Sequence, residues 1–174
     1  MNLSEIMLKR RSVRKFKSGE IPESKLDSII RAALLAPTSR NRNPCEFIVV
    51  KDKNVLRELS AAKKAGALLL SNADAAIAVF ADSEKADTWI EDSSIALTYM
   101  MLAATEQGIG NCWVQYHLRF DENGESAEDN ARRILSMPDK YHIVGVLGLG
   151  IPDEFPEAKT MDELDFEKVR YVKK

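Results

Sequence analysis

Cysteine and histidine are scarce in this chain of 174 residues, which contains two of each. Cys45 and Cys112 stand far apart, so they form neither a disulfide framework nor a metal-binding pair, and we expect a reducing, cytoplasmic location. The motifs His-x-x-x-His and Cys-x-x-Cys do not occur, which argues against zinc and iron–sulfur sites. His117 and His142 accompany no Gly-x-Ser-x-Gly elbow, so a hydrolase triad has no support.

Long apolar runs and nucleotide-binding glycine motifs are also missing. The longest apolar run, at 65–70, is far too short to cross a bilayer, and the interrupted apolar start of the chain does not resemble an export signal. Gly108-Ile-Gly110 closes a predicted helix and lacks the third glycine of a dinucleotide fingerprint, and no Walker lysine motif occurs. The net charge of −2 argues against general affinity for nucleic acid. We therefore expect neither nucleic acid nor a membrane as a partner.

The composition is that of an ordinary globular protein, with 45% hydrophobic and 30% charged residues. The length fits one domain spanning 1–174. Apolar periodicity and capping residues predict helices from Leu3, then at 22–35, 54–65, 88–107 and 131–137. β-Branched apolar runs predict strands at 47–50, 75–80, 112–114 and 141–147. This alternation favours a layered α/β or α+β domain.

Two segments of this pattern point to a partner. The predicted helix at 88–107 is apolar almost all round, which is typical of a helix buried centrally or against another subunit. The extension at 153–174 has few core-sized apolar groups, so it is either free or packed on a partner, and its end at 169–174 is a candidate strand.

Positive charge is concentrated near the start of the chain. Six of the nine residues at 9–17 are cationic, although the chain as a whole has 25 basic and 27 acidic residues. A solvated turn after a helix is the ordinary interpretation of such a run. Against it, Arg10 and Arg11 carry planar forks that bind phosphate in bidentate fashion, and Ser12 adds a neutral hydroxyl. The run therefore also suits a ligand that combines a phosphate, hydroxyls and a polar ring.

A second candidate is the loop at 36–44. Its prolines, serine and asparagines are ordinary turn residues. However, Thr38, Ser39 and Asn41 offer three hydrogen-bonding side chains just ahead of a buried strand, and ligand contacts concentrate on loops held by rigid elements.

Four motifs in this order resemble those of the nitroreductase family of FMN-dependent oxidoreductases. They are Arg10-Arg-Ser-Val-Arg14, Ala36-Pro-Thr-Ser-Arg-Asn41 with Asn43-Pro44, Gly108-Ile-Gly-Asn-Cys-Trp113, and Gly150-Ile-Pro152; Trp89-Ile-Glu-Asp92 is similar as well. The resemblance implies an α+β fold, a three-layer sandwich with a central mixed β-sheet and helices on both faces. It also implies a homodimer that exchanges its C-terminal tails and holds two FMN molecules at the interface.

The resemblance assigns cofactor contacts by position and leaves the chemistry to FMN, with no catalytic side chain. Arg10, Ser12 and the neighbouring Arg11 and Arg14 would bind the phosphate and ribityl end. Trp113, Val114 and Gln115 would lie along the isoalloxazine, and Gly150 would lie near the phosphate. The other subunit would contribute Pro37, Thr38, Ser39 and Asn41.

Two departures from the family pattern affect these expectations. Cys45 stands where the family often has an aromatic residue, so a smaller side chain there leaves space or implies local repacking. Only Lys159 is basic soon after the Gly-x-Pro element, so Arg10 should contribute more to phosphate binding than Lys159 does.

The function implied by the resemblance is transfer of hydride from NAD(P)H to a small oxidised acceptor, such as a nitroaromatic or a quinone. Both would use one flavin face in a ping-pong cycle. An alternative is a flavin-binding sensor or carrier with little turnover, which the same residues would serve. A third hypothesis, an interaction module that binds nucleic acid through the basic run, is opposed by the acidic balance elsewhere.

Overall fold

The computed structural model describes residues 1–172 and is built on one four-stranded sheet in the order β1-β2-β4-β3. The strands are β1 (Cys45–Val50), β2 (Ala75–Asp82), β3 (Gly110–Gln115) and β4 (Tyr141–Gly150). The α-helices are α1 (Leu3–Lys9), α2 (Glu23–Leu34), α3 (Lys53–Ala61), α4 (Trp89–Glu106) and α5 (Ala127–Ile134). Short 3-10 turns are η1 (Ser39–Asn41), η2 (Leu68–Asn72), η3 (Met161–Glu163) and η4 (Phe166–Lys168).

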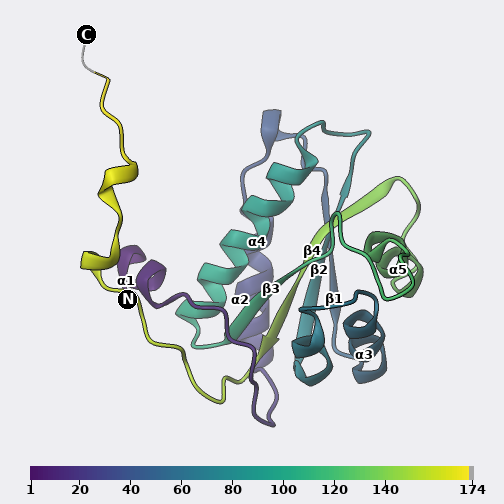
Figure 1. Ribbon diagram of the computed structural model, residues 1–174, viewed down its shortest axis with the longest axis horizontal. Coiled ribbons are helices and arrows are strands. Elements are labelled where there is room, and N and C mark those ends of the chain that lie inside the picture. Colours follow the sequence, from purple (N-terminus) through teal and green to yellow (C-terminus); the bar gives the residue numbers. More distant parts are fainter. Residues whose placement is uncertain (173–174) are drawn as a thin grey trace.

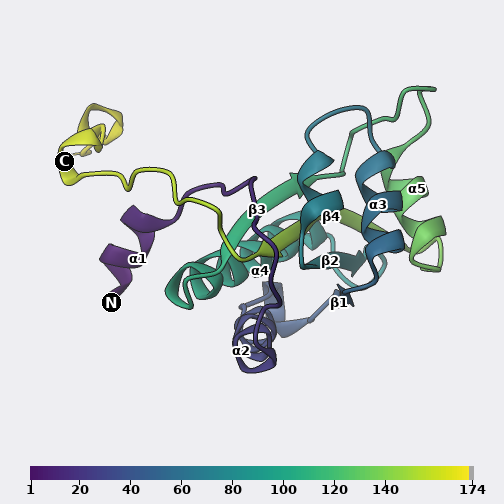
Figure 2. The ribbon, with the colours of Figure 1, turned by 90° about the horizontal axis from the view of Figure 1, so that it is seen from below.

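Helices cover both faces of the sheet. One face packs against α2 and α4, and the other packs against α3, η2 and α5 (Figures 1 and 2). Each face has its own apolar core, the first around Ile29, Leu97 and Met100 and the second around Leu56 and Leu59. The predicted α+β three-layer sandwich is thereby confirmed.

The continuous apolar run of β2 follows from its central position. All eight of its residues are buried, because the strand has a neighbour on each side and a helical layer on each face. Ala78 and Phe80 contribute to the core beneath α3 and α5, whereas Ile77 and Val79 contribute to the core beneath α2 and α4. A strand buried on both faces shows no alternation of polar and apolar residues.

One detail of the expected sheet is wrong for this chain: its described strands are all antiparallel to their neighbours, so the sheet is not mixed. Strands β2 and β3 run in the same direction and are joined by the crossover helix α4. However, β4 lies between them and is antiparallel to both. The described part of the chain therefore contains no parallel neighbouring pair.

Capping decided where the helices begin. The capping box of α1 is confirmed, since Glu5 N–H donates to Asn2 Oδ1 and Asn2 N–H donates to Glu5 Oε2, both at 3.0 Å. Helix α3 begins after Asp52 instead of at Asn54, and α5 begins after Ser126, four residues before the predicted start. In each case the side chain preceding the helix accepts a bond from a backbone N–H in the first turn.

The C-terminal extension and α1 stand apart from the sheet (Figures 1 and 2). Every described residue from Asp153 onward is exposed. The extension touches α1 where Lys159 N–H donates to the Leu8 carbonyl at 3.0 Å. The predicted strand at 169–174 is not formed at 169–172, and its last two residues lie outside the described part. Among the described helices, none has the length and apolar character needed to span a membrane.

Candidate flavin site

The basic run at 9–17, called the basic segment below, begins at the last residue of α1 and is held against one end of β3 and of β4. Val13 N–H donates to the Asn111 carbonyl at 2.9 Å, and Lys17 N–H donates to the Ile151 carbonyl at 3.0 Å. Glycine is required at two positions for this approach. A Cβ at Gly150 would lie 2.5 Å from the Phe16 ring, and one at Gly110 would lie 2.9 Å from Val13 Cγ1. The segment is therefore fixed along the sheet by close packing and backbone hydrogen bonds.

Three of the four predicted phosphate-binding residues gather near Cys112 on β3. Burial raises the pKa of the Cys112 thiol, while the charges of Arg14 and Arg10 and the Ser12 hydroxyl oppose that rise. Neither arginine forms an ion pair with a carboxylate within the described residues. The two guanidinium groups therefore keep their capacity to bind an anion.

Arg11 points to a different partner. Its guanidinium donates to the carbonyl of Glu157 in the C-terminal extension. Together with the bond between Lys159 and Leu8, this contact ties the extension to the end of α1. The basic run is thus divided in this chain: Arg11 binds the extension, and Arg10, Ser12 and Arg14 lie along β3.

Trp113, Val114 and Gln115 form the second half of β3. Trp113 Nε1–H donates to Gln115 Oε1 at 2.9 Å, and Gln115 Nε2–H donates to the His117 carbonyl at 3.2 Å. Val114 faces the core beneath α3 and α5 and is 1% exposed, so its side chain is not available to a ligand. The side chains of Trp113 and Gln115 are half-buried and already oriented by one another.

Lys63 lies at the same end of β3, although nothing in the sequence distinguished it from Lys64. Its ammonium donates to the Gln115 carbonyl at 2.7 Å. Burial lowers the pKa of Lys63, and the charge of Arg119 lowers it further. A half-buried cation here would stabilise negative charge on a ring bound along β3.

The predicted loop residues Pro37, Thr38, Ser39 and Asn41 lie at the other end of the molecule. Ser39 N–H donates to Asp92 Oδ1 at 2.9 Å, which places the loop at the first turn of α4. The basic segment lies beside the last turn of α4. Its Val13 binds the Asn111 carbonyl, and Asn111 Nδ2–H donates to Thr105 Oγ1 at 3.2 Å. The rise of about 1.5 Å per residue separates Asp92 from Thr105 by about 20 Å. One chain therefore keeps the predicted loop apart from the basic segment.

Comparison with known proteins identifies the fold that carries these residues. The sequence matches the pattern of the nitroreductase family over residues 7–82 and 62–151, which together cover most of the chain. The chain belongs to the nitroreductase family. A relative from Archaeoglobus fulgidus, named as a candidate NADH dehydrogenase/NAD(P)H nitroreductase, is 34% identical over 158 residues, with 88% of this chain and 87% of the relative covered.

Solved structures agree with this membership of the nitroreductase family. An FMN-dependent nitroreductase from Clostridium difficile superposes with a TM-score of 0.93 at 44% identity, covering 98% of this chain and 99% of the other. A nitroreductase family protein from strain 630 of the same species superposes with a TM-score of 0.78 at 30% identity, covering 99% and 94%.

Both histidines of this nitroreductase meet at one carboxylate beside Trp89. His117 Nδ1 lies 2.8 Å from Glu128 Oε1, and His142 Nδ1 lies 3.8 Å from Glu128 Oε2. The Trp89 ring contacts the two imidazoles with centroids 5.2 and 5.0 Å away. This cluster connects Trp89 of α4, Glu128 of α5 and His142 of β4. Within the described residues, no group of histidine, cysteine and carboxylate side chains could hold a metal ion.

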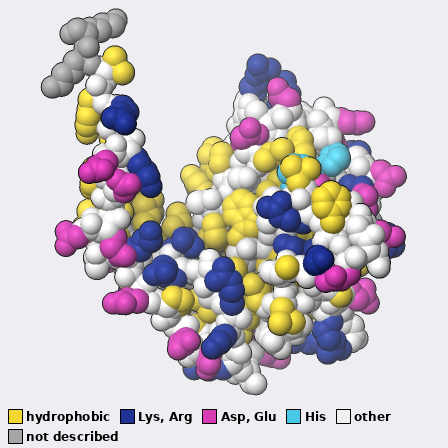
Figure 3. Space-filling view, in the orientation of Figure 1, with side chains coloured by type: hydrophobic (Ala, Val, Ile, Leu, Met, Phe, Trp, Pro, Cys, Tyr) yellow, Lys and Arg dark blue, Asp and Glu magenta, His cyan; other side chains and the backbone are white. Residues whose placement is uncertain are grey.

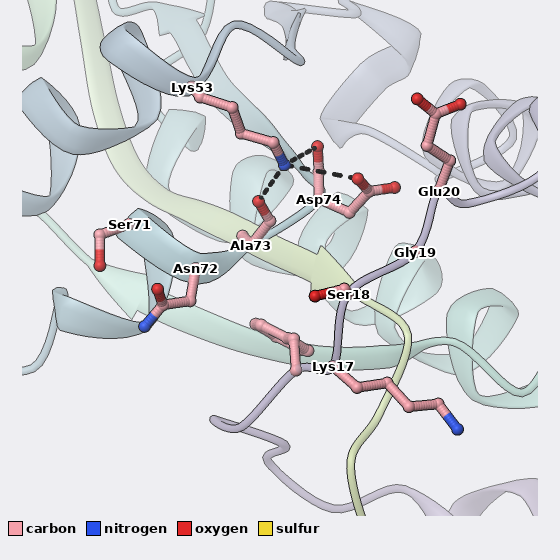
Figure 4. Close-up of a pocket in the computed structure, with 10 residues that line it drawn as sticks. Lys17, Ser18, Gly19, Glu20, Lys53, Ser71, Asn72, Ala73 and Asp74 are labelled. Carbon is pink, nitrogen blue, oxygen red and sulfur yellow. Dashed lines mark hydrogen bonds and ion pairs between the residues drawn. The ribbon is translucent and has the colours of Figure 1, made fainter.

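A polar hollow of about 450 Å³ lies next to Lys17, between the basic segment and η2 (Figure 4). Two of its charged side chains are paired: Lys53 Nζ–H donates to the Ala73 carbonyl at 2.7 Å and reaches Asp74 Oδ1 at 3.4 Å. Asp74 in turn accepts from the Ile21 backbone N–H. None of the twelve predicted cofactor contacts lines this hollow, and its Lys53 and Asp74 bind one another.

Proposed function

We propose that this nitroreductase is an FMN-dependent oxidoreductase that takes hydride from NAD(P)H and reduces a small oxidised acceptor, such as a nitroaromatic or a quinone, at one shared flavin face. The observation that carries the proposal is the group formed by Arg10, Ser12 and Arg14 beside Cys112 of β3, two cations and a hydroxyl with no carboxylate partner in the described chain. The solved relative at 44% identity is FMN-dependent.

The donor set fits a flavin mononucleotide. The guanidinium groups of Arg10 and Arg14 would hold the phosphate, for which arginine forks are well matched. The backbone N–H of Gln115 lies on the edge of β3 away from β4, where it could meet the ring edge, and the Lys63 ammonium lies beside it. When bound, FMN supplies the hydride chemistry, and the protein orients it and tunes its charge. Lys63 and the arginines would favour the anionic, reduced form.

We further propose that the active unit is a homodimer, with the loop at Pro37, Thr38, Ser39 and Asn41 reaching the partner's cofactor. The separation of about 20 Å along α4 supports this arrangement, since it keeps the loop of one chain away from the phosphate-binding end of the same chain's site. A second copy in the opposite orientation would place its loop beside the basic segment of the first.

The surface around α4 supports the same assembly. Ile95 and Tyr99 are 37% and 40% exposed on a helix that is apolar almost all round. An apolar groove of about 580 Å³ runs between α1 and α4, lined in part by Leu3 and Met7. The hollow between the body and the projecting extension has hydrophobic side chains on its walls (Figure 3). A second copy would cover this surface and receive the extension, whose Phe166 is 68% exposed.

Both cysteines are free, which suits the cytoplasmic location that we propose for a single domain spanning the chain.

The deciding experiment is an absorbance spectrum of the purified protein with its cofactor identified by mass, followed by anaerobic titration with NADH and NADPH. Rapid flavin bleaching by either donor, and recolouring by a nitroaromatic or quinone, is the expected result. Slow bleaching with both donors would favour a flavin carrier. Protein that stays colourless after FMN addition, with unchanged intrinsic fluorescence, would refute FMN binding altogether.

A further inference from the structure

Asp92 is a buried carboxylate that the proposed chemistry does not use. It lies in the first turn of α4 and is 2% exposed. Its Oδ1 accepts from Ser39 N–H at 2.9 Å, and its Oδ2 accepts from the Thr88 hydroxyl at 3.2 Å. A buried carboxylate is costly unless it is hydrogen-bonded, so these two bonds are needed to keep it there.

The loop that Asp92 holds has an unusual backbone. Arg40, Asn41 and Asn43 have φ angles of 51°, 54° and 48°, in the left-handed region that non-glycine residues seldom adopt. Such conformations persist only where surrounding contacts over-determine them. Asn43 N–H donates to Thr38 Oγ1 at 3.0 Å, which closes the loop upon itself. The bond to Asp92 then fixes the closed loop to α4.

Close packing does not hold the loop from behind. A cavity of about 320 Å³ lies there, lined by Thr38, Asn43, Cys45 and Asp92 together with apolar side chains of α2, β1 and α4. Cys45 lines this cavity, in agreement with the first of the two expectations for its small side chain. With this void beside it, the loop depends on directed hydrogen bonds more than on contact with a core.

The contact with Asp92 does not use the Ser39 hydroxyl, one of the predicted ligand groups of the loop. Asp92 takes the backbone N–H of Ser39, whereas the Ser39 hydroxyl has no hydrogen-bond partner in the part of the chain that the structure describes. A latch through the backbone thus orders the loop without occupying the side chain that would meet a ligand.

We propose that Asp92 is a positioning residue: its buried carboxylate latches the loop at 38–43 in the shape that binds the partner's FMN. The identity of the ligand rests on the proposed function, but the latch itself does not. Ordering the loop before binding removes an entropic cost from the binding step, so losing the latch weakens affinity.

The test combines hydrogen exchange and FMN titration. Amide exchange is measured by mass spectrometry on peptides covering 36–44 in the flavin-free protein, and FMN affinity is measured by fluorescence quenching. The variants are Asp92→Ala and the nearly isosteric Asp92→Asn, which retains an acceptor for Ser39 N–H. Glu91→Ala is the matched control, because Glu91 is an exposed carboxylate in the same helical turn. It has the same favourable position relative to the helix dipole.

We expect exchange at 36–44 to accelerate about tenfold or more in Asp92→Ala, the effect of losing a charge-assisted hydrogen bond, while peptides of β2 remain protected. The exchange rate at 36–44 in Asp92→Asn should lie between those of Asp92→Ala and wild type, and the rate in Glu91→Ala should match wild type. The FMN dissociation constant should follow the same order. If Asp92→Ala does not fold, Asp92→Asn carries the comparison, since its shape is preserved.

Two results would overturn the proposal. Unchanged loop exchange in Asp92→Ala and Asp92→Asn would show that no latch exists. Faster loop exchange with unchanged FMN affinity would show that the loop is latched but does not position the cofactor. A wild-type protein that fails to bind FMN refutes the proposed function instead, and the exchange order among the variants still decides whether Asp92 holds the loop.

Discussion

Gly145 in β4 offers the sharpest test of how β3 is packed. It pairs with Gln115 of β3, and a Cβ at this position would lie 2.6 Å from Trp113 Nε1 and 2.9 Å from the Val114 carbonyl oxygen. The indole could swing aside, but the carbonyl belongs to the backbone of β3 and can move only with the strand. Gly145→Ala should therefore displace β3 and break the 2.9 Å bond between Trp113 and Gln115.

The magnitude follows from overpacking, which costs about 1–3 kcal/mol for an added methyl group in a well-packed core. Removing a glycine from a strand returns about 0.5–1 kcal/mol. The net loss in the free energy of unfolding should be about 1–2 kcal/mol, or about 0.5–1 M in the urea midpoint for a slope near 2 kcal/mol/M.

Gly148→Ala, on the same strand, is the matched control. There a Cβ would meet only Leu69 Cδ1 at 2.5 Å and Leu70 Cδ2 at 3.0 Å, the ends of flexible side chains, and the nearest backbone atom is 3.8 Å away. Urea unfolding of both variants is measured on flavin-free protein at one protein concentration, because bound ligand and subunit assembly shift the urea midpoint. Equal midpoint shifts, with Trp113 emission unchanged in Gly145→Ala, would show that this account of β3 is wrong.

Three further predictions concern charge and titration. Arg10→Ala should weaken FMN binding about 10- to 100-fold through lost charge-assisted bonds, and Lys159→Ala should weaken it less; equal dissociation constants by fluorescence titration would contradict this ranking. Burial raises the pKa of the Cys112 thiol above its ordinary 9.0, so its alkylation rate in flavin-free protein should still rise with pH at 9.0, and a plateau below pH 8 would contradict burial. The ion pair with Lys140 lowers the pKa of Asp82 below its ordinary 3.8. The stability that this carboxylate contributes is therefore present at pH values above 3.8 and is lost as the pH falls through the lowered pKa. Urea midpoints should therefore fall less steeply with acidification in Asp82→Asn than in wild type, and parallel curves would refute the assignment.

The types of the regular elements could be predicted from local patterns. The run at Ala75–Asp82 is apolar at every position, and such a run forms a strand buried on both faces. Helix boundaries were less accurate, because several side chains compete to cap a first turn. Asp52 caps α3 in place of the nearby Asn54, and Ser126 begins α5 within a segment that looked like a polar excursion.

The candidate site was predictable only as separate motifs. The motif around Arg10 identified cations suited to a phosphate, but local sequence does not show that Arg11 turns to the C-terminal extension. Asp92 appeared in a recognised motif without a role, since a carboxylate in a first helical turn is commonplace. Lys63 looked like any lysine near a helix end. Each of these roles depends on a contact with a residue distant in sequence.

What the sequence determined by itself is therefore local and chemical: the strands and helices, the absence of zinc and iron–sulfur motifs, and the residue types able to bind a phosphate. Tertiary structure alone decided the arrangement. Helix α4 crosses from β2 to β3 with β4 between them, so the loop at Ser39 and the basic segment at Arg10 lie at its opposite ends. A repeating pattern of side chains sets which face of a helix is buried, but the ends of that helix are brought to their neighbours only by packing against the sheet.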